Sequence, residues 1–209
     1  MANRTALTVG AACWLVAAVG YVVLELLAAL AVPGYSYTKH YISSLGVPAW
    51  SPRWYLMNAA FFGQGVLFVA GALIVARAVQ ARWTGLLFVA LAVITAAGDF
   101  LVGIVYGGSP LWNDGQEWLH ALGAVLAILG GNAAVLAGTA VAGRAIGVRL
   151  YRVAGTLIGI AGLVILAVLQ NYNYWAVNYV PIGLVERACV YTIMIWQTIT
   201  AIALLRRRP

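Results

Sequence analysis

Six long apolar segments, separated by short polar stretches, restrict what this chain can fold into. Each is long enough to cross about 30 Å of hydrocarbon as a helix that rises about 1.5 Å per residue. None of the six prolines falls inside a segment, as expected because lipid requires an unbroken helical hydrogen-bond ladder. The expected spans are Ala6–Val32, Trp54–Gln80, Thr84–Tyr106, Glu117–Arg144, Tyr151–Asn171 and Leu184–Leu205. The sequence therefore predicts an all-α polytopic membrane protein, a single six-helix domain over residues 1–209.

The composition agrees with a chain whose solvent is lipid. Hydrophobic residues make up 64% and charged residues 8%, against roughly 45–50% and 25% in a soluble domain. The net charge of +7 does not indicate nucleic-acid binding, because the basic residues lie singly or in short clusters at the ends of the apolar segments. The first segment is longer than the apolar core of a signal peptide and contains Glu25, so we expect a retained span.

The distribution of basic residues predicts the orientation. If the N-terminus is cytoplasmic, nine arginines fall on the cytoplasmic side and three basic residues on the outer side. This asymmetry follows the positive-inside rule and predicts that both termini are cytoplasmic. The inner residues are Arg4, Arg77, Arg82, Arg144, Arg149, Arg152 and Arg206 to Arg208, and the outer ones are Lys39, Arg53 and Arg187.

The first outer loop, residues 33–53, is the longest polar interruption. Its stretch from Tyr35 to Arg53 contains three Tyr, one Trp, a Lys-His pair, two adjacent Ser and a Gly-Val-Pro turn. Aromatic rings of this kind either anchor a chain at the lipid headgroups or pack against apolar surface. We expect the loop to fold over the outer mouth of the bundle.

All five acidic residues and both histidines fall in the outer half, which is where chemistry is expected. Ionisable groups within a span are costly and usually face the bundle interior or a wet cavity. The candidate catalytic residues are Glu25, His40, Asp99 and His120. The candidate substrate-binding residues are Lys39, Ser43, Ser44, Asn58, Glu117, Arg187 and Tyr191.

Glu25 and Asp99 are predicted to face one shared cavity. Glu25 lies eight residues before Pro33 and Asp99 eight before Gly107, where the two outward-running spans have ended, which places both about 12 Å below the outer helix ends. We expect Tyr191, His120 and Asn58 to supply hydrogen-bond donors there.

Each candidate has a structural alternative. Arg187 and its neighbour Glu186 are expected to interact with headgroups or loops, Glu117 to favour a helix N-terminus electrostatically, and His120 to be a hydrogen-bonded structural histidine. Four amides are expected as contacts between helices: Asn58, Gln64, Asn132 and Gln197.

Two site classes have the residues but not the spacing. A metal site from Glu25, His40, Asp99 and His120 lacks a His-x-x-x-His or Glu-x-x-His pair, so no metal and no cofactor are predicted. A serine hydrolase would use Ser43 or Ser44, but the chain has no Gly-x-Ser-x-Gly turn.

The stretch Tyr41-Ile-Ser-Ser-Leu-Gly46, with Gly108-Ser-Pro-Leu-Trp and Glu117-Trp-Leu-His120, resembles a bacterial six-span family, domain of unknown function 998. The layout is more distantly similar to the eukaryotic Frag1/DRAM/Sfk1 group. Ser44 stands where the bacterial signature usually has Asp, so no carboxylate is carried over to that position. The resemblance implies a bacterial cytoplasmic membrane, and the eukaryotic group suggests, by analogy, a role with outer-leaflet lipids.

Three functions remain open. The first is an outward-facing polar cavity that binds, or binds and modifies, a lipid or another amphipathic molecule. The second is a non-catalytic accessory subunit, which leaves room for a homo-oligomer or a partner membrane protein. The third is a transporter or channel, which is disfavoured because the cytoplasmic half lacks acids and no inverted repeat is visible.

Overall fold

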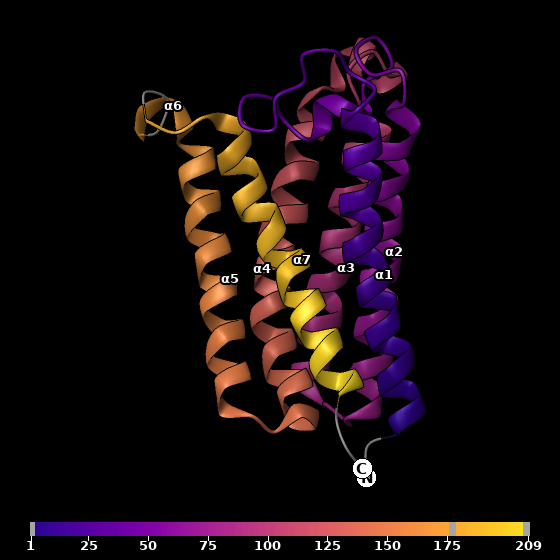
Figure 1. The fold of residues 1–209 in the computed structure, drawn as a ribbon, viewed down its shortest axis with the longest axis vertical. Coiled ribbons are helices and arrows are strands. Elements are labelled where there is room, and N and C mark those ends of the chain that lie inside the picture. Colours follow the sequence, from indigo (N-terminus) through magenta and orange to yellow (C-terminus); the bar gives the residue numbers. More distant parts are fainter. Residues whose placement is uncertain (1–2, 176–178, 207–209) are drawn as a thin grey trace.

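The computed structural model describes residues 3–175 and 179–206, which form an all-helical bundle (Figure 1). Six helices are long and apolar enough to cross a membrane, and this confirms the predicted fold class. They are α1 (Arg4–Ala29), α2 (Trp54–Ala78), α3 (Trp83–Ile104), α4 (Trp118–Ile146), α5 (Arg149–Gln170) and α7 (Ile182–Leu205). The shorter elements are η1 (Ser43–Gly46), η2 (Trp112–Gln116) and α6 (Tyr172–Trp175).

Consecutive long helices run antiparallel and pack side by side from α1 to α5 (Figure 1). The last helix, α7, crosses the bundle and contacts α1, α4 and α5, so it closes the ring. The described parts of the three longer connections, residues 30–53, 105–117 and 171–175 with 179–181, all lie at one end, which we call the loop end.

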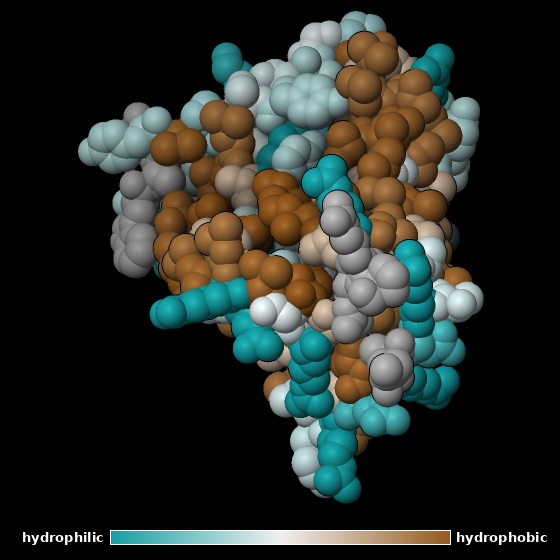
Figure 2. All heavy atoms as spheres, turned by 60° about the horizontal axis from the view of Figure 1, so that its bottom comes forward, coloured by the Kyte–Doolittle hydropathy of each residue, from teal (hydrophilic) through white to brown (hydrophobic). Residues whose placement is uncertain are grey.

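The opposite end, where α1 begins and α7 ends, carries most of the exposed basic side chains that the structure describes, and we call it the arginine end. Figure 2, in which this end is turned forward, shows hydrophilic side chains around it beside hydrophobic flanks. The described arginines here are Arg4, Arg77, Arg82, Arg144, Arg149, Arg152 and Arg206. The chain thus has the charge asymmetry from which cytoplasmic termini were predicted, and the orientation itself stays a prediction.

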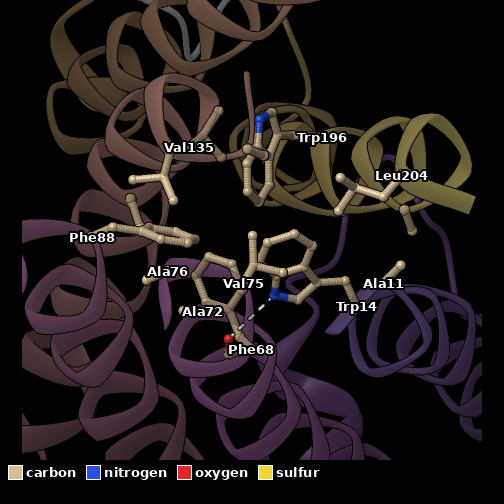
Figure 3. Packing of buried hydrophobic residues seen from close by; sticks show 14 of the residues in the cluster. Ala11, Trp14, Phe68, Ala72, Val75, Ala76, Phe88, Val135, Trp196 and Leu204 are labelled. Atoms are coloured by element: carbon tan, nitrogen blue, oxygen red, sulfur yellow. Dashed lines mark hydrogen bonds between the residues drawn. The ribbon is translucent and has the colours of Figure 1, made fainter. Parts of the chain in front are cut away.

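Four aromatic rings fill the arginine half of the interior (Figure 3). Trp14 packs on Trp196 with ring centroids 5.2 Å apart, and Phe88 lies 6.0 Å from each of them. Phe68 completes the group, and the Trp14 indole N–H donates to its carbonyl oxygen at 3.3 Å. This four-ring cluster joins α1, α2, α3 and α7 and fills the space between them in the half of the bundle nearer the arginine end.

The α4–α5 contact depends on small residues, because a side chain at either of two glycines would collide with α4. A Cβ atom on Gly155 would lie 2.3 Å from the Thr139 hydroxyl, and one on Gly159 would lie 2.6 Å from Leu136. The Gly-x-x-x-Gly spacing of this pair therefore lets α5 lie close against α4.

The first loop, residues 30–53, packs onto the bundle. Ile42 and Leu45 are fully buried and belong to one apolar cluster with residues of α1, α2 and α3. The rings of Tyr35, His40 and Trp50 pack against one another, with centroids 5.2 to 5.8 Å apart. These contacts fold the loop over the end of the bundle, as expected from its aromatic content.

Candidate functional site

A buried ion pair joins α7 to α1 at the loop end. Arg187 Nε donates to Glu25 Oε1 at 3.0 Å, and Arg187 Nη2 lies 2.9 Å from the same oxygen. The second carboxylate oxygen of Glu25 accepts a hydrogen bond from the Tyr191 hydroxyl at 2.8 Å. Glu25 is 0% and Arg187 4% exposed. Such a pair is stable in a low-dielectric interior only when its remaining donors and acceptors are also satisfied.

Arg187 satisfies its remaining donors by holding the first loop. Nη1 donates to the carbonyl oxygens of Tyr37 and His40 at 2.7 and 2.9 Å and to that of Gly183 at 3.2 Å. Nη2 donates to the Tyr35 hydroxyl, and the guanidinium carbon lies 4.7 Å from the centre of the Tyr37 ring. One guanidinium therefore binds α1, α7 and the loop at once, which a lysine ammonium, lacking the planar fork, could not reproduce.

The Tyr35 hydroxyl in this group stays protonated at physiological pH. Burial raises the pKa of Tyr35 to about 12, and the neighbouring Arg187 only partly opposes this shift. The neutral phenol is therefore the form that accepts the hydrogen bond from Arg187.

Glu186, next to Arg187 in the sequence, makes a second contact with the loop. Its Oε2 accepts a hydrogen bond from the Ile42 backbone N–H at 2.5 Å. Glu186 also lines a cavity beneath the loop, together with Ile42 and Ser43. The same carboxylate therefore fixes the loop and forms part of the cavity wall.

This cavity has a volume of about 50 Å³ and lies between α1, α2, α3, α4 and α7. Most of its lining is apolar. The polar side chains in its wall are Tyr21, Ser43, Gln64, Thr95, Asp99 and Glu186. Since about 10–15 Å³ accommodates one water molecule, the cavity has room for a group of about three or four non-hydrogen atoms.

The wall of the cavity offers acceptors that the protein does not use. Neither Asp99 Oδ2 nor Gln64 Oε1 has a hydrogen-bond partner among the residues that the structure describes. Asp99 is 7% and Gln64 3% exposed. A buried acceptor without a partner is costly, and an unpaired carboxylate in hydrocarbon much more so. The cavity is thus suited to a small group that carries hydrogen-bond donors or a positive charge.

On the side of the arginine end, the cavity is bounded by a pair of side-chain amides and, below it, by the four-ring cluster. Gln64 Nε2 donates to Gln197 Oε1 at 3.1 Å, which links α2 to α7. Gln64 lies one turn before Phe68 on α2, and Gln197 follows Trp196 on α7. The amide pair therefore lies next to the four-ring cluster, which fills the interior below it.

The structure separates the four candidate catalytic residues. Asp99 lines the cavity, whereas Glu25 lies outside its lining and binds Arg187 and Tyr191. The predicted cavity shared by Glu25 and Asp99 is wrong in its pairing, because the acid that accompanies Asp99 is Glu186. His40 Nδ1 accepts from the Ser36 backbone N–H at 3.1 Å, within the first loop.

The other histidine, His120, links the start of α4 to the end of α3. His120 Nδ1 lies 2.7 Å from the Val105 carbonyl oxygen, and its ring packs against Trp112. Among the described residues, no three His, Cys, Asp or Glu side chains come close enough to hold a metal ion.

The structure also separates the candidate substrate-binding residues into those that line the cavity and those that lie outside it. Ser43 lines the cavity, Tyr191 binds Glu25, and Arg187 holds the loop. Lys39 and Glu117 are exposed, and Ser44 is half-buried outside the cavity lining.

Asn58 fixes the loop from α2 instead of contributing to the cavity. Its side-chain amide donates to the Gly46 carbonyl oxygen at 3.2 Å. The contact is close, because a Cβ atom at Gly46 would lie 2.3 Å from Asn58 Oδ1.

Four polar cavity residues were missed as site candidates. Glu186 was expected to contact headgroups or loops, Gln64 was expected only as a contact between helices, and Tyr21 and Thr95 were not candidates for the site. Depth in the membrane could have indicated that Gln64 and Thr95 share a site, because they lie ten and nine residues from the loop end of their helices. At about 1.5 Å per residue both are within about 2 Å of one depth.

Comparison with known families adds one result. The model of the family described as "Protein of unknown function (DUF998)" matches residues 15–203, which include α2 to α5 in full and parts of α1 and α7. No curated protein and no solved structure matches the chain. The family match covers most of the sequence and includes the Ile42–Gly46 stretch above the cavity. The chain therefore belongs to the DUF998 family of membrane proteins of unknown function.

Proposed function

We propose that the protein binds the positively charged head of an amphipathic molecule, with a primary ammonium group as the simplest case, in the cavity beneath the first loop. The observation that carries this proposal is that Asp99 and Glu186 line one cavity with Gln64, while Asp99 Oδ2 and Gln64 Oε1 are unpartnered among the described residues.

The chemistry of the wall favours a donor of hydrogen bonds over an acceptor. A carboxylate offers only acceptor atoms when it is ionised, and an ammonium group offers three donors and a compensating charge. An anion would meet two carboxyl groups, and a neutral apolar group would leave the buried acceptors unpaired. A primary ammonium on a short carbon stem matches both the acceptors and the volume of about 50 Å³.

Binding is favoured over catalysis because of where the candidate groups lie. His40 and His120 both contact backbone groups, and neither lines the cavity that holds Asp99. The four-ring cluster beneath the cavity favours binding over passage, since a transport path would have to cross tightly packed aromatic rings.

The proposed source of the ligand is the membrane itself. Membrane lipids with amine heads combine an ammonium group with an apolar part, and the cavity lies directly beneath the loop, whose Ile42 and Ser43 are in its lining. We place the loop end outside a bacterial cytoplasmic membrane, in line with the basic residues at the arginine end.

A thermal-unfolding measurement tests the head site. The purified protein, in bilayer discs of phosphatidylcholine, is titrated with ethylammonium, and ethanol serves as the neutral ligand of similar size. We expect ethylammonium, but not ethanol, to raise the unfolding temperature in a saturable manner, since a ligand that binds only the folded state stabilises it.

Variants locate the effect. Asp99→Asn should abolish the ethylammonium response, and Asp114→Asn is the matched control, because Asp114 is an exposed aspartate outside the cavity. If both variants still show the rise in unfolding temperature with ethylammonium, or if ethanol produces the same rise, the proposal is wrong. The protein would then be better explained as a non-catalytic accessory subunit.

A further inference from the structure

An apolar groove runs along the lipid-facing side of the α1–α7 contact. It has a volume of about 390 Å³ and is lined mainly by exposed valines and isoleucines, among them Val19, Val22, Ile195 and Ile199. Because α1 and α7 both span the membrane, this surface lies at the depth of the lipid chains.

The groove offers no unused polar group to a ligand among its lining residues. The Tyr191 hydroxyl donates to Glu25 at 2.8 Å, and the Thr198 hydroxyl donates to the Met194 carbonyl oxygen of its own helix at 2.9 Å. A hydrocarbon chain is the occupant that such a surface fits, since it needs no hydrogen-bond partner.

The groove and the cavity share a wall. Met194 lines both hollows, and its side chain is 5% exposed. Its long, unbranched side chain has three rotatable bonds, so it can change rotamer without moving the helix backbone. Among the described residues it is the single one that lines both.

The depths of the two hollows match the order of groups in a lipid. Along α7, which starts at Ile182, Glu186 comes after four residues, Met194 after twelve and Ile199 after seventeen. These steps correspond to about 6, 18 and 26 Å from the loop end. The polar wall therefore lies nearer the membrane surface, and the groove continues toward the middle of the bilayer.

We propose that this groove binds the hydrocarbon chain of the ligand whose ammonium head occupies the Asp99–Glu186 cavity, and that Met194 moves aside to join the two hollows. This inference rests on the proposed function and narrows the ligand to a chain-bearing amine that enters laterally from the membrane. The groove supplies affinity for the chain, and the cavity supplies recognition of the head.

Chain length is the variable that tests the groove. Ethylammonium and decylammonium are titrated into the protein in phosphatidylcholine discs, and the ratio of their apparent dissociation constants is recorded for each variant. A longer chain also concentrates its amine in the bilayer, but this partition is the same for every variant and cancels in the comparison.

Two groove-filling variants, Val22→Trp on α1 and Ile199→Trp on α7, are compared with Val16→Trp, which lies on the lipid-facing side of α1 outside the groove lining. We expect decylammonium to bind the wild type and Val16→Trp at least tenfold tighter than ethylammonium. In the groove variants the ratio should fall at least fivefold, while the affinity for ethylammonium stays within twofold.

The possible failures are distinguishable. Suppose that ethylammonium binds normally and that the ratio of the two dissociation constants is the same in all variants. The groove then does not bind the hydrocarbon chain, while the proposed ammonium site in the cavity stands. If ethylammonium does not bind the wild type, both proposals are wrong. Unfolding temperatures of the four proteins show whether each variant is folded, and two independent groove variants guard against the loss of one.

Discussion

Arg187 on α7 and Glu25 on α1 form a buried ion pair whose guanidinium also holds the first loop through two carbonyl oxygens. The pair lies between the last and the first long helix, so it closes the bundle at the loop end. Its neighbour Glu186 binds the same loop and lines the cavity. The architecture of this end therefore places the proposed head site directly beneath a segment fixed by two adjacent residues.

Removing the guanidinium should destabilise the protein severely. Arg187→Gln leaves Glu25 buried without its counter-charge, and breaking such a pair typically costs about 3–5 kcal/mol. Arg187→Lys should rescue little, because one ammonium cannot reach Glu25 and both carbonyl oxygens. Arg53→Gln is the control, since Arg53 is exposed and its side chain donates, within the described part of the chain, only to the Leu27 carbonyl oxygen.

Unfolding temperatures measured in detergent and in bilayer discs check this prediction. A wild-type unfolding temperature for Arg187→Gln would show that the ion pair does not hold the bundle together.

The Glu186 contact should control how firmly the first loop is held. Glu186→Ala removes the acceptor for the Ile42 N–H, and a hydrogen bond to a charged group is worth about 1.5–3 kcal/mol. We expect faster proteolysis between Tyr35 and Arg53 in this variant. Glu186→Gln keeps an acceptor oxygen and should be cleaved at nearly the wild-type rate. Identical cleavage of wild type and Glu186→Ala would mean that the loop is held without this contact.

Gly162 is a position where the packing of α5 excludes any side chain. A Cβ atom there would lie 1.8 Å from Asn132 Oδ1 and 2.6 Å from the Thr192 hydroxyl, which are themselves hydrogen-bonded at 2.7 Å. Gly162→Ala should therefore cost about 1–3 kcal/mol through overpacking. Gly63→Ala is the matched control, because nothing lies within 4 Å of its Cβ position, and it should be neutral or slightly stabilising.

Denaturant unfolding in mixed micelles compares the two glycine variants. Equal stability of both would show that α5 does not approach α4 and α7 as closely as the structure indicates.

The orientation is tested by labelling in intact cells, starting from a variant with Cys13 and Cys189 replaced by alanine. A cysteine at Ser36 should react with a membrane-impermeant thiol reagent, and one at Arg82 should react only after lysis, since the two lie at opposite ends of the bundle. The reverse pattern would place the arginine end outside.

The sequence predicted the spans because lipid leaves a simple signal, a long apolar run without proline. It also placed Glu25 at a depth where Tyr191 can reach it, since depth follows from the rise per residue. The sequence did not predict which face of each helix points into the bundle, because these helices are strongly apolar and show no clear polar face.

Neighbouring residues on a helix point about 100° apart, so Arg187 faces α1 and the loop while Glu186 faces the loop and the cavity. That difference explains why the acid beside Asp99 is Glu186 and not Glu25. The roles of His40 and His120 depended on backbone carbonyl and amide groups of irregular segments, which side-chain patterns do not reveal.

The central claim, that an ammonium group binds beside Asp99, is tested most directly by NMR. Asp99 and Asp114 are the only two aspartates in the sequence, so their carboxyl signals can be told apart. Protein labelled with ¹³C at the aspartate carboxyl carbon should give two NMR signals, assigned with Asp114→Asn. Saturable displacement of the Asp99 signal by ethylammonium, with the signal of exposed Asp114 unchanged, is the result we predict. An unchanged Asp99 signal, or equal displacement of both, would contradict an ammonium site in the cavity.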